Sequence, residues 1–547
     1  MAPLQDPSAQ PDPPAPKPLY DMIVVQTPPK IVNSTVQFDD KPTYEDAILG
    51  TDKNKWISAM QDEIESIERN QTWRLVKLPP GRKAIGVRWV LNVKRDAKGA
   101  IIKHKARLVA KGYSQEFGFD FEETYAPVVR IEHVRILFAL AAYFNLPIIH
   151  LDAKNAFLHG DSDFAIYIQQ PPGFENPAHP NSVLLLLKSL YGLKQAFRIW
   201  YLALYDAIID LNFESSEFDP CIFISQRWHL LLAIYVDDIL VMGPQVKCNE
   251  FAKQLSRQFR ITNQGHVSSF LGINVERSNG MIFLNQIGYI DRMAKRFQLE
   301  SCNPTFTPLD HSLPLLKAEF DTPRTDETLY RELTGSLNHL AICTRPDTSL
   351  AVSKMSQFNQ DPTITDHNAA RRILKYAKTT KHYSIKYSSI KKTLQLDGYA
   401  DADWGSNLID RKSTTGYIFM MNGGPISWTS RKQSTVALST MEAEYMALSD
   451  AARELVAHLT FFQTISIELP LPILYTDNEA AESIAKREPE YQRSKHIDIR
   501  YHFLRDHYEK ETFNIQHIPG TEQIADILTK PLSKFKHHTI VQALRLN

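Results

Sequence analysis

Two adjacent aspartates interrupt an otherwise apolar segment, Leu231–Gly243 (LLAIYVDDILVMG). The apolar residues on either side favour strands, so the segment is predicted to form a β-hairpin with Asp237 and Asp238 at its tip. A turn alone explains one aspartate, because Asp suits turns. It explains less well two adjacent carboxylates in apolar surroundings, where like charges repel and burial increases the cost. Divalent cations would remove that cost, and Mg²⁺ prefers oxygen ligands.

A third acid lies upstream in Ile148–Gly160 (IIHLDAKNAFLHG), where a predicted strand delivers Asp152 at its end. Taken alone, Asp152 is read more simply as the N-cap of the helix-like stretch Ala153–Leu158. Beside the predicted hairpin the metal reading is favoured. One carboxylate from a strand end and two from a hairpin tip could hold two metals about 4 Å apart, an arrangement suited to in-line phosphoryl transfer.

Charge becomes informative only when it is examined locally. Over 547 residues, 62 Lys+Arg balance 62 Asp+Glu. Residues 81–113, however, carry ten Lys/Arg and one acid, a net charge of +9. Alternating patterns over 87–93 and 101–110, around Asp96–Gly99, predict a β-hairpin. A hairpin of this charge would attract phosphates, and the alternative is a basic face that meets only solvent.

Acids also recur at the ends of expected elements in the C-terminal part. Each acid alone has an ordinary structural explanation, because acids at helix N-termini are favoured by the dipole and Asp after a strand often caps the next helix. The segments are a strand in Leu394–Gly405 (LQLDGYADADWG), a helix start in Ser439–Leu448 (STMEAEYMAL), a strand end in Ile473–Ala480 (ILYTDNEA), and a loop leading into a helix in His517–Lys530 (HIPGTEQIADILTK).

The periodicity indicates two units of mixed structure joined by a largely helical connector. Short strands and helices alternate to about residue 300, a helical stretch runs from about 328 to 380, and a second mixed unit begins at Ser384. The predicted fold class is therefore multidomain, with α+β and α/β parts.

Composition excludes several classes of protein. Four cysteines, none in a C-x-x-C pair, exclude a disulfide scaffold and argue against structural zinc, so a reduced, intracellular protein is expected. Seven prolines in the first 18 residues leave no apolar core for a signal peptide. The most apolar runs are too short to span a membrane.

Several segments, in order, resemble the reverse transcriptase of copia-type LTR retrotransposons. The tetrad YVDD alone is weak evidence, but the ordered set is specific and covers roughly residues 40 to 540. The matching stretches are KARLVAKGYSQEFGFDFEETYAPVVR (105–130), LDAKNAFLHGD (151–161), QPPGF (170–174), SLYGLKQAFRIWY (189–201), YVDD (235–238), FLGINVER (270–277) and YRELTGSLNHLAICTRPDTSLAV (330–352).

The resemblance implies a right-hand polymerase with fingers, palm and thumb, a helical connector and a C-terminal ribonuclease H-like domain. On this basis the expected domains follow one another along the chain. They are a Pro-rich disordered tail at 1–38, reverse transcriptase fingers, palm and thumb at 39–300, a thumb or connection region at 301–383, the ribonuclease H-like domain at 384–535, and a tail at 536–547.

The same resemblance implies roles for residues of the first unit. Asp152, Asp237 and Asp238 correspond to the catalytic, metal-binding triad of the palm. The positions implied to bind nucleotide, template or primer are Arg107 with Lys105 or Lys103 on the triphosphate, Phe157 as an aromatic gate against a 2′-hydroxyl (alternatively core packing), Gly192 and Lys194 near template and nucleotide, and the hairpin Phe270, Leu271 and Gly272 under the primer end.

In the second unit the resemblance is to ribonuclease H, and four carboxylates are implied to hold two magnesium ions. They are Asp401, Glu444, Asp477 and Asp526, with Asp403 and Glu442 as the near alternatives. His517 is implied to assist proton transfer or product release, because histidine exchanges protons near neutral pH. The cations of Lys495–Arg500 either touch the hybrid or meet solvent.

One position departs from the family. Phe197 stands where the family usually has Pro, so a bulky aromatic ring replaces a fixed backbone turn. This puts the template-side geometry in doubt and leaves the metal site untouched.

The expected function is RNA-directed DNA polymerase with ribonuclease H activity, from a retrotransposon. The alternative is a decayed or co-opted relic that only binds nucleic acid. Two Mg²⁺ per site are expected, with Mn²⁺ as the other candidate. The expected partners are RNA template, DNA primer, RNA–DNA hybrid and deoxynucleoside triphosphates, without a membrane, and other retroelement proteins such as capsid and integrase. The expected location is the cytoplasm, in a virus-like particle, with the nucleus as the alternative.

No D-T-G or D-S-G protease motif and no H-H-C-C cluster is found. In the family these lie upstream in one polyprotein. The chain is therefore expected to be the C-terminal portion of such a polyprotein, or a reading frame truncated to it.

Overall fold

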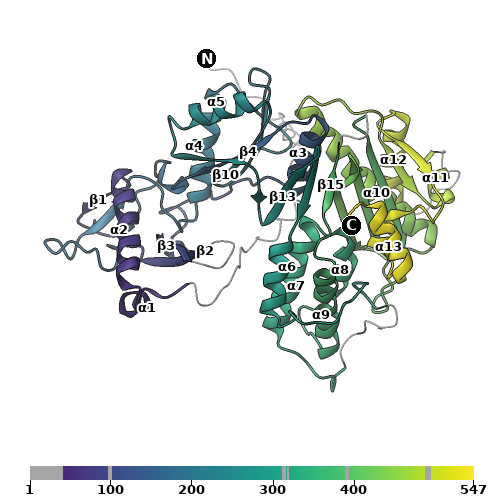
Figure 1. Cartoon of the computed structure of the whole chain (residues 1–547), viewed down its shortest axis with the longest axis horizontal. Coiled ribbons are helices and arrows are strands. Elements are labelled where there is room, and N and C mark those ends of the chain that lie inside the picture. Colours follow the sequence, from purple (N-terminus) through teal and green to yellow (C-terminus); the bar gives the residue numbers. More distant parts are fainter. Residues whose placement is uncertain (1–40, 96–100, 311–315, 317–318, 389–392, 487–494) are drawn as a thin grey trace, which may run out of the picture. The chain divides into compact units, whose positions relative to one another are not determined.

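The computed structural model describes residues 41–95, 101–310, 316, 319–388, 393–486 and 495–547 (Figure 1). The predicted Pro-rich tail at 1–38 and the tip of the basic hairpin at Asp96–Gly99 lie outside these residues. The fold is a mixture of helices and sheets, as the periodicity predicts. Among the helices of the described ranges, none combines the length and apolar character needed to cross a bilayer.

The first described part packs two helices against the basic hairpin. The predicted helix over 43–68 is divided at Gly50, whose N–H donates to the carbonyl of Asp46. The second helix packs on β3, where buried and part-exposed residues alternate. The elements are α1 (Tyr44–Leu49), α2 (Lys53–Arg69), the paired strands β2 (Val87–Arg95) and β3 (Ile101–Ala110), and the antiparallel sheet β1 (Trp73–Val76), β6 (Val183–Leu186), β5 (Tyr167–Ile168).

A central antiparallel sheet carries the Asp-Asp segment in its interior. Its strands β4, β9 and β10 are buried almost throughout, which explains their nearly continuous apolar sequence. The strands, in spatial order, are β11 (Ile261–His266), β4 (Ile148–Ala153), β10 (Asp238–Met242), β9 (Leu230–Tyr235), β8 (Ile222–Ser225) and β7 (Glu214–Ser215). The helices of this region are α3 (Ile131–Tyr143), α4 (Ala196–Asp210) and α5 (Gln245–Leu255), with short 3₁₀ turns at η3 (Gly112–Ser114) and η4 (Ala156–Leu158).

The connector consists of a small antiparallel sheet followed by helices, in agreement with the helical periodicity over 328–380. The sheet is β12 (Ser269–Phe270), β13 (Ile273–Ser278), β14 (Met281–Asn285) and β15 (Ile385–Tyr387). The helices are α6 (Ile287–Arg296), α7 (Glu327–Cys343), η5 (Pro346–Thr348), α8 (Ser349–Ser356) and α9 (Ile364–Thr379).

A buried ion pair ties these connector helices together. Arg345 and Asp347 are each 1% exposed and form a bidentate contact of 2.9 and 2.7 Å. The hydroxyl of Tyr376, on α9, donates to Asp347 at 2.6 Å. Burial opposes ionisation, but the Arg345 guanidinium outweighs it and holds the pKa of the Asp347 carboxyl below its usual value. The charges are therefore fully paired inside the connector.

Arg345→Met is expected to lower the free energy of unfolding by about 3–5 kcal/mol, because it leaves the Asp347 carboxylate buried without its partner. The measurement is thermal or urea unfolding of the full chain. Arg324→Met is the matched control, since Arg324 makes a similar bidentate pair with Asp361 on the surface, where solvent screens the charges and the loss should be much smaller. Equal losses in the two variants would contradict this account of the connector.

The C-terminal unit is a mixed sheet with helices. Strand β19 lies parallel to β16 and β20, whereas β16, β17 and β18 are antiparallel. The strands, in spatial order, are β18 (Gly424–Lys432), β17 (Thr414–Met421), β16 (Leu396–Asp403), β19 (Ile473–Thr476) and β20 (Asn514–His517). The helices are α10 (Thr440–Thr464), α11 (Glu479–Lys486), α12 (Lys495–Glu509), the 3₁₀ turn η6 (Ile524–Leu528) and α13 (Lys534–Ala543).

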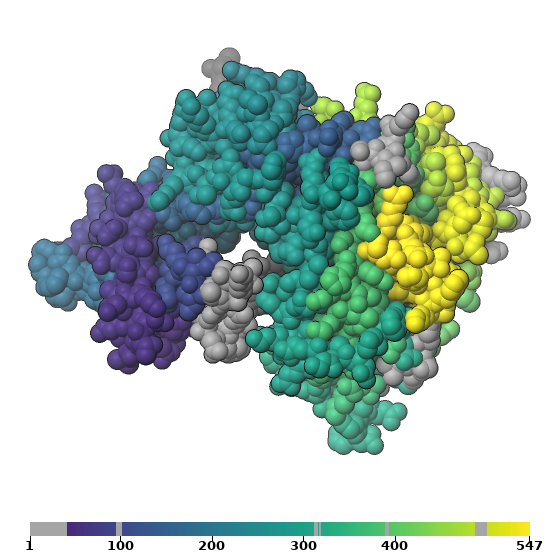
Figure 2. Space-filling view, viewed as in Figure 1, coloured from purple at the N-terminus to yellow at the C-terminus, as the bar shows by residue number. Residues whose placement is uncertain are grey.

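One sequence prediction about the end of the chain is wrong. Residues 536–547 are not a free tail, because most of them belong to α13, and Leu544 and Leu546 are fully buried. The N–H of Ser384 donates to the carbonyl of Leu546 at 2.7 Å. The space-filling view accordingly shows the yellow C-terminal residues lying against the green surface (Figure 2). Asp526 lies on the short 3₁₀ helix η6, after the loop that begins at His517, as the sequence predicts.

Three groups of buried apolar side chains make up most of the core. The largest runs without interruption from the central sheet into the C-terminal sheet, and includes Leu151, Ile239 and Ile418. A second joins α2 to the basic hairpin, and a third fills the connector helices. The two clusters of acids identified in the sequence therefore lie at the edges of one continuous core.

Candidate active sites

The turn that carries Asp237 is strained and held on two sides. Tyr235 pairs with Asp238, so the β9–β10 loop has only two residues. The first of them, Val236, has φ 57°, a conformation that β-branched residues rarely adopt. The indole N–H of Trp200 donates to the Val236 carbonyl at 2.7 Å, and the N–H of Ala153 donates to the Asp237 carbonyl at 2.8 Å. Helix α4 and strand β4 thereby fix the tip.

The predicted first triad is brought to one place by strand register. Asp152 lies directly opposite Asp238 in the β4–β10 ladder, which puts their Cβ atoms about 5 Å apart. Burial raises the pKa of Asp237, and the neighbouring charges of Asp238 and Asp152 raise it further. The three acids thus form a concentrated negative site at the hairpin tip, as the sequence indicated.

Two side chains, a histidine and a lysine, which the sequence analysis did not identify, already contact this triad. His150 Nε2 lies 2.7 Å from Asp238 Oδ1, and Lys154 forms an ion pair with Asp152. In the part of the chain that the structure describes, the triad is not among the groups of acids whose ligand atoms all lie within 4.8 Å. The signal for His150 was present in the sequence, because residues two apart on a strand share a face, and His150 precedes Asp152 by two.

Arg107 lies on the same side of its hairpin as the other two candidate cations, Lys103 and Lys105, since strand residues two apart share a face. Its guanidinium lies 5.0 Å from the ring centre of Tyr191, and its charge acts on Asp237. Burial raises the pKa of Tyr191 to about 12 although Arg107 opposes the shift. The side chain of Arg107 is thus placed between the basic hairpin and the acidic tip.

Gly192 and Lys194 have local structural roles at the end of β3. Gly192 has φ 91°, and a Cβ there would lie 2.3 Å from the carbonyl oxygen of Ala110, so only glycine fits. The Lys194 ammonium lies 3.3 Å from the Gln115 carbonyl oxygen and 4.3 Å from the ring centre of Phe121. Lys194 is therefore engaged with the loop after β3.

Phe157 contacts the residue that departs from the family pattern. Its ring lies edge-on to Phe197, with centroids 4.8 Å apart, and edge-on to Tyr191 at 5.0 Å. Phe157 is half-buried, whereas Phe197 is 49% exposed on the first turn of α4. The aromatic at 197 thus supports the side chain proposed as a gate.

Residues 270–272 form a hairpin, and its implied place under the primer end stays a prediction. Leu271 and Gly272 have φ of 51° and 77°, the pair of positive values typical of a tight two-residue turn between β12 and β13. Phe270 is buried, and its ring lies edge-on to His150 with centroids 5.9 Å apart. His150 therefore contacts both Asp238 and this hairpin.

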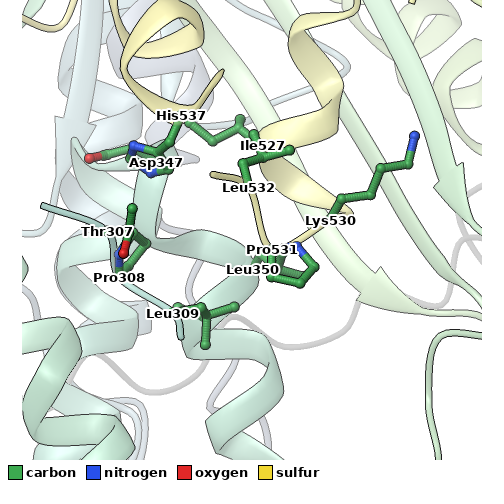
Figure 3. A pocket seen from close by; sticks show the side chains of 11 residues that line it. Thr307, Pro308, Leu309, Asp347, Leu350, Ile527, Lys530, Pro531, Leu532 and His537 are labelled. Carbon is green, nitrogen blue, oxygen red and sulfur yellow. The ribbon is translucent and has the colours of Figure 1, made fainter. Parts of the chain in front are cut away.

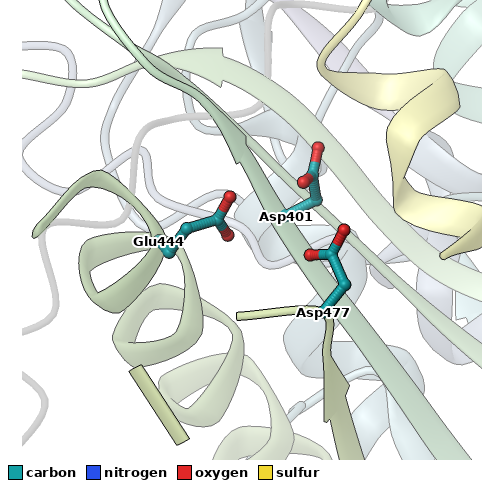
Figure 4. A group of neighbouring side chains, drawn as sticks. All are labelled: Asp401, Glu444 and Asp477. Atoms are coloured by element: carbon teal, nitrogen blue, oxygen red, sulfur yellow. The ribbon is translucent and has the colours of Figure 1, made fainter. Parts of the chain in front are cut away.

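The second constellation comes together in the C-terminal unit. Asp401, Glu444 and Asp477 bring one carboxylate oxygen each within 4.8 Å of one another (Figure 4). The parallel register explains this, because Tyr399 pairs with Tyr475 and each acid follows its strand partner by two residues. Glu444 reaches the same point from the first turns of α10, where its side chain accepts from the Ala402 N–H at 3.1 Å.

The electrostatics of this trio favour a bound cation. Asp401 is fully buried and Glu444 is 6% exposed. Burial raises the pKa of Glu444, and the charges of Asp401 and Asp477 raise it further. Three crowded carboxylate oxygens are the donor set that a hard divalent cation prefers, and a cation would relieve the repulsion. The residues present therefore fit a Mg²⁺ ion.

The near alternatives have other partners. Glu442 Oε2 accepts from the Leu438 N–H at 2.7 Å, and its own N–H donates to Ser439, so this acid serves the start of α10. Asp403 lies two residues beyond Asp401 on β16, where burial raises its pKa and Lys354 opposes the shift. The structure thus brings Glu444 and Asp401 into the trio, and leaves Glu442 and Asp403 outside it.

Asp526 is not part of the trio. Both of its carboxylate oxygens contact lysines, Lys530 at 2.6 Å and Lys536, and Lys530 also lies 2.9 Å from Asp401 Oδ1. His517 is exposed, and its Nε2 lies 3.3 Å from the carbonyl oxygen of Asp477. Of the Lys495–Arg500 stretch, the side chains before Arg500 lie outside the described residues.

Comparison with known proteins shows which proteins the chain resembles. A family model described as reverse transcriptase (RNA-dependent DNA polymerase) matches residues 70–311. The chain is 36% identical over 498 residues to a retrovirus-related Pol polyprotein from transposon TNT 1-94 of Nicotiana tabacum, covering 89% of this chain and 37% of that protein. It is 34% identical over 311 residues to a transposon Ty5-1 protein of Saccharomyces cerevisiae, covering 56% of this chain and 100% of that protein.

A third relative is the retrovirus-related Pol polyprotein from transposon RE1 of Arabidopsis thaliana, 38% identical over 494 residues that cover 89% of this chain and 33% of that protein. The chain thus spans about a third of the length of the Pol polyproteins it matches. Among solved structures, a foamy viral protease-reverse transcriptase in complex with RNA/DNA hybrid aligns with a TM-score of 0.47 and 12% identity, over 88% of this chain and 55% of that chain.

Proposed function

Because the chain belongs to the family of copia-type retrotransposon Pol polyproteins, we propose that it is an RNA-directed DNA polymerase that also cleaves the RNA strand of RNA–DNA hybrids. The observation that carries the polymerase proposal is the match over residues 70–311, which contain both β4 and the β9–β10 hairpin. The observation that carries the ribonuclease proposal is the carboxylate trio of the C-terminal unit.

In the polymerase reaction, Asp152, Asp237 and Asp238 would hold Mg²⁺, which when bound activates the primer 3′-hydroxyl and neutralises the leaving pyrophosphate. The contacts of Trp200 and Ala153 with the turn keep Asp237 in place while substrates change. Arg107 would orient the triphosphate, because its planar guanidinium donates two parallel hydrogen bonds to a phosphate.

In the ribonuclease reaction, Asp401, Glu444 and Asp477 would hold Mg²⁺, which supplies a water nucleophile and charge stabilisation at the RNA phosphodiester. The burial of Asp401 and Glu444 keeps bulk water away from two of the three ligands. His517 stands exposed beside Asp477, where it could exchange a proton with the departing strand.

The two activities serve one product. A DNA copy remains paired with its RNA template until that strand is degraded, so a chain with both activities can prepare its own product for second-strand synthesis. The proposed substrates are an RNA template, a DNA primer and deoxynucleoside triphosphates, followed by the hybrid. The proposed location is cytoplasmic, within a particle formed with other retroelement proteins.

The test of the proposal is extension of a labelled DNA primer on an RNA template with Mg²⁺, with Asp237→Asn as the inactive comparison. We expect extension by the wild-type chain alone. Equal background in both proteins, with retained binding of primer and template, would instead support a relic that binds without catalysis. Cleavage of a labelled hybrid, with Asp477→Asn as its comparison, tests the second activity separately.

Phe157→Val is expected to raise the incorporation of ribonucleotides relative to deoxyribonucleotides by about tenfold, a discrimination of about 1.4 kcal/mol. The proposed reason is that the Phe157 ring closes the space that a 2′-hydroxyl would need. The measurement is kcat/KM for one nucleotide in both sugar forms.

Phe197→Pro is the matched comparison, since it removes the ring that supports Phe157, and proline is tolerated in the first turn of α4. It should shift the ratio less than Phe157→Val does. An unchanged ratio in Phe157→Val would restrict Phe157 to core packing.

A further inference from the structure

The centre around Asp401 contains a cation of its own. The Lys530 ammonium lies 2.9 Å from Asp401 Oδ1 and 2.6 Å from Asp526 Oδ1, so it bridges the two carboxylates. The group that lies between these two acids is therefore a fixed positive charge.

The remaining oxygens of the two acids are also engaged. Asp526 Oδ2 contacts the Lys536 ammonium. Each of the two carboxylate oxygens of Asp526 is therefore paired with a lysine. Asp401 Oδ2 accepts from the hydroxyl of Thr529. The trio itself consists of Asp401, Glu444 and Asp477, and Asp526 is joined to it only through Lys530.

The backbone and the apolar neighbours of Lys530 also hold it in this position. Lys530 follows Asp526 by one helical turn, and its N–H donates to the Asp526 carbonyl at 2.9 Å. It also lines a small cavity with Ile527, Leu532 and Leu350, and Figure 3 shows its side chain extending away from these apolar neighbours. The ammonium is therefore directed at the acids by packing of its own segment.

The charges of these side chains determine how many divalent cations the centre needs for neutrality. When all four acids are ionised, as in the metal-bound state, the ammonium groups of Lys530 and Lys536 leave two negative charges, which one divalent cation balances. Without Lys530 a third negative charge would remain, buried at Asp401 and Asp526, each about 1% exposed or less. Buried charges of like sign without compensation are costly, and a second divalent cation would be the natural replacement.

We propose that Lys530 is a built-in cation of the ribonuclease centre, which occupies the position between Asp401 and Asp526 and confines divalent-cation binding in the substrate-free protein to Asp401, Glu444 and Asp477. In the substrate-free protein Asp526 is then a positioning residue for Lys530 and not a metal ligand. The inference rests on the proposed ribonuclease function for its meaning, but it concerns cation binding, which can be measured without activity.

The experiment counts bound Mn²⁺ by electron paramagnetic resonance in the full chain carrying Asp237→Asn and Asp238→Asn, which disable the other acidic site. We expect one tightly bound Mn²⁺, which Glu444→Gln removes and Asp526→Asn leaves in place. Lys530→Met should raise the count to two, and adding Asp526→Asn to it should restore one. Lys510→Met is the matched control, since Lys510, directly after α12, pairs with Asp506 at the same sequence spacing on the surface, and it should change nothing.

Two results would overturn the inference. The first is two bound Mn²⁺ in the protein that retains Lys530, with the number lowered by Asp526→Asn. The second is one bound Mn²⁺ both before and after Lys530→Met, in a variant that folds. If Lys530→Met does not fold, the Asp526→Asn count decides alone. Hybrid cleavage separates the two proposals. If the protein with Lys530 cleaves the hybrid and binds two Mn²⁺, only the lysine inference is contradicted. If it binds one Mn²⁺ and does not cleave, only the ribonuclease proposal is contradicted.

Discussion

Asp238→Asn is expected to lower primer extension on an RNA template by about 10³-fold, or about 4 kcal/mol of transition-state stabilisation. Asp238 directly follows the strained turn, lies opposite Asp152 of strand β4 and contacts His150. An amide at this position keeps the shape of the side chain and removes the negative charge that would hold Mg²⁺. The loss should therefore appear in kcat, with little change in binding of primer and template.

The control for this prediction is Asp210→Asn, which removes an exposed carboxylate at the end of α4. It should leave extension within about twofold, because exposed charges far from the acids are screened. Hybrid cleavage by Asp238→Asn should also stay near the wild-type rate, since the trio lies in another unit. Extension that survives Asp238→Asn would remove this carboxylate from the reaction and leave Asp237 and Asp152 to be tested.

The neighbours of the triad refine the same prediction. His150 contacts Asp238 at 2.7 Å, and Lys154 pairs with Asp152, so both acids have a resident partner before substrate arrives. A nucleotide bound with Mg²⁺ would have to draw these carboxylates toward the metal. Breaking the ion pair of Lys154 costs little free energy, because Lys154 is exposed. Breaking the contact of His150 costs more, because His150 is buried and packs edge-on against Phe270.

The sequence predicted those features that follow from local pattern. The hairpin tip at Asp237 and the strand end at Asp152 were both marked by apolar runs that end in acidic residues, whereas the hairpin at Gly272 was implied only by the family resemblance. Their proximity could not follow from pattern alone. It depends on the register of β4 against β10, which the sequence does not encode in any single segment.

The features that the sequence analysis missed are partners that come from a distance. Lys530 reaches Asp401 across 129 positions of the chain, and Trp200 reaches Val236 across 36. No spacing of residues in the sequence predicts that a given lysine or tryptophan makes such a distant contact. The predicted tail was wrong for a different reason, because Ile540, Val541 and Leu544 recur at helical spacing, a signal that was present in the sequence and was not used.

Glu444→Gln is expected to abolish hybrid cleavage, by about 10³-fold or more, and at the same time to stabilise the metal-free protein. The reason for both effects is the crowding of three carboxylates. Burial raises the pKa of Glu444, and Asp401 and Asp477 raise it further, so the folded state disfavours the charged form. Glutamine removes that charge and the repulsion with it, and also removes a ligand for Mg²⁺.

The pH dependence follows from the sign of that shift. A carboxyl whose pKa is raised by folding binds its proton more tightly in the folded chain than in the unfolded chain, so its contribution to stability falls as pH rises above the usual glutamate value. Glutamine has no such dependence. In EDTA, the melting temperature of Glu444→Gln minus that of the wild type should therefore grow between about pH 5 and pH 8, by about 2–4 °C for each kcal/mol of relieved repulsion.

Mg²⁺ should reverse the order of stability. A cation bound at one hundred times its dissociation constant stabilises the folded wild type by about 2.7 kcal/mol, whereas the variant has lost a ligand and gains less. Differential scanning fluorimetry in EDTA and in Mg²⁺ measures both effects on one pair of proteins. A Glu444→Gln protein that is less stable than the wild type in EDTA at every pH would mean that Glu444 acts mainly through its bond to the Ala402 N–H, and the trio would then not be a site held ready for a cation.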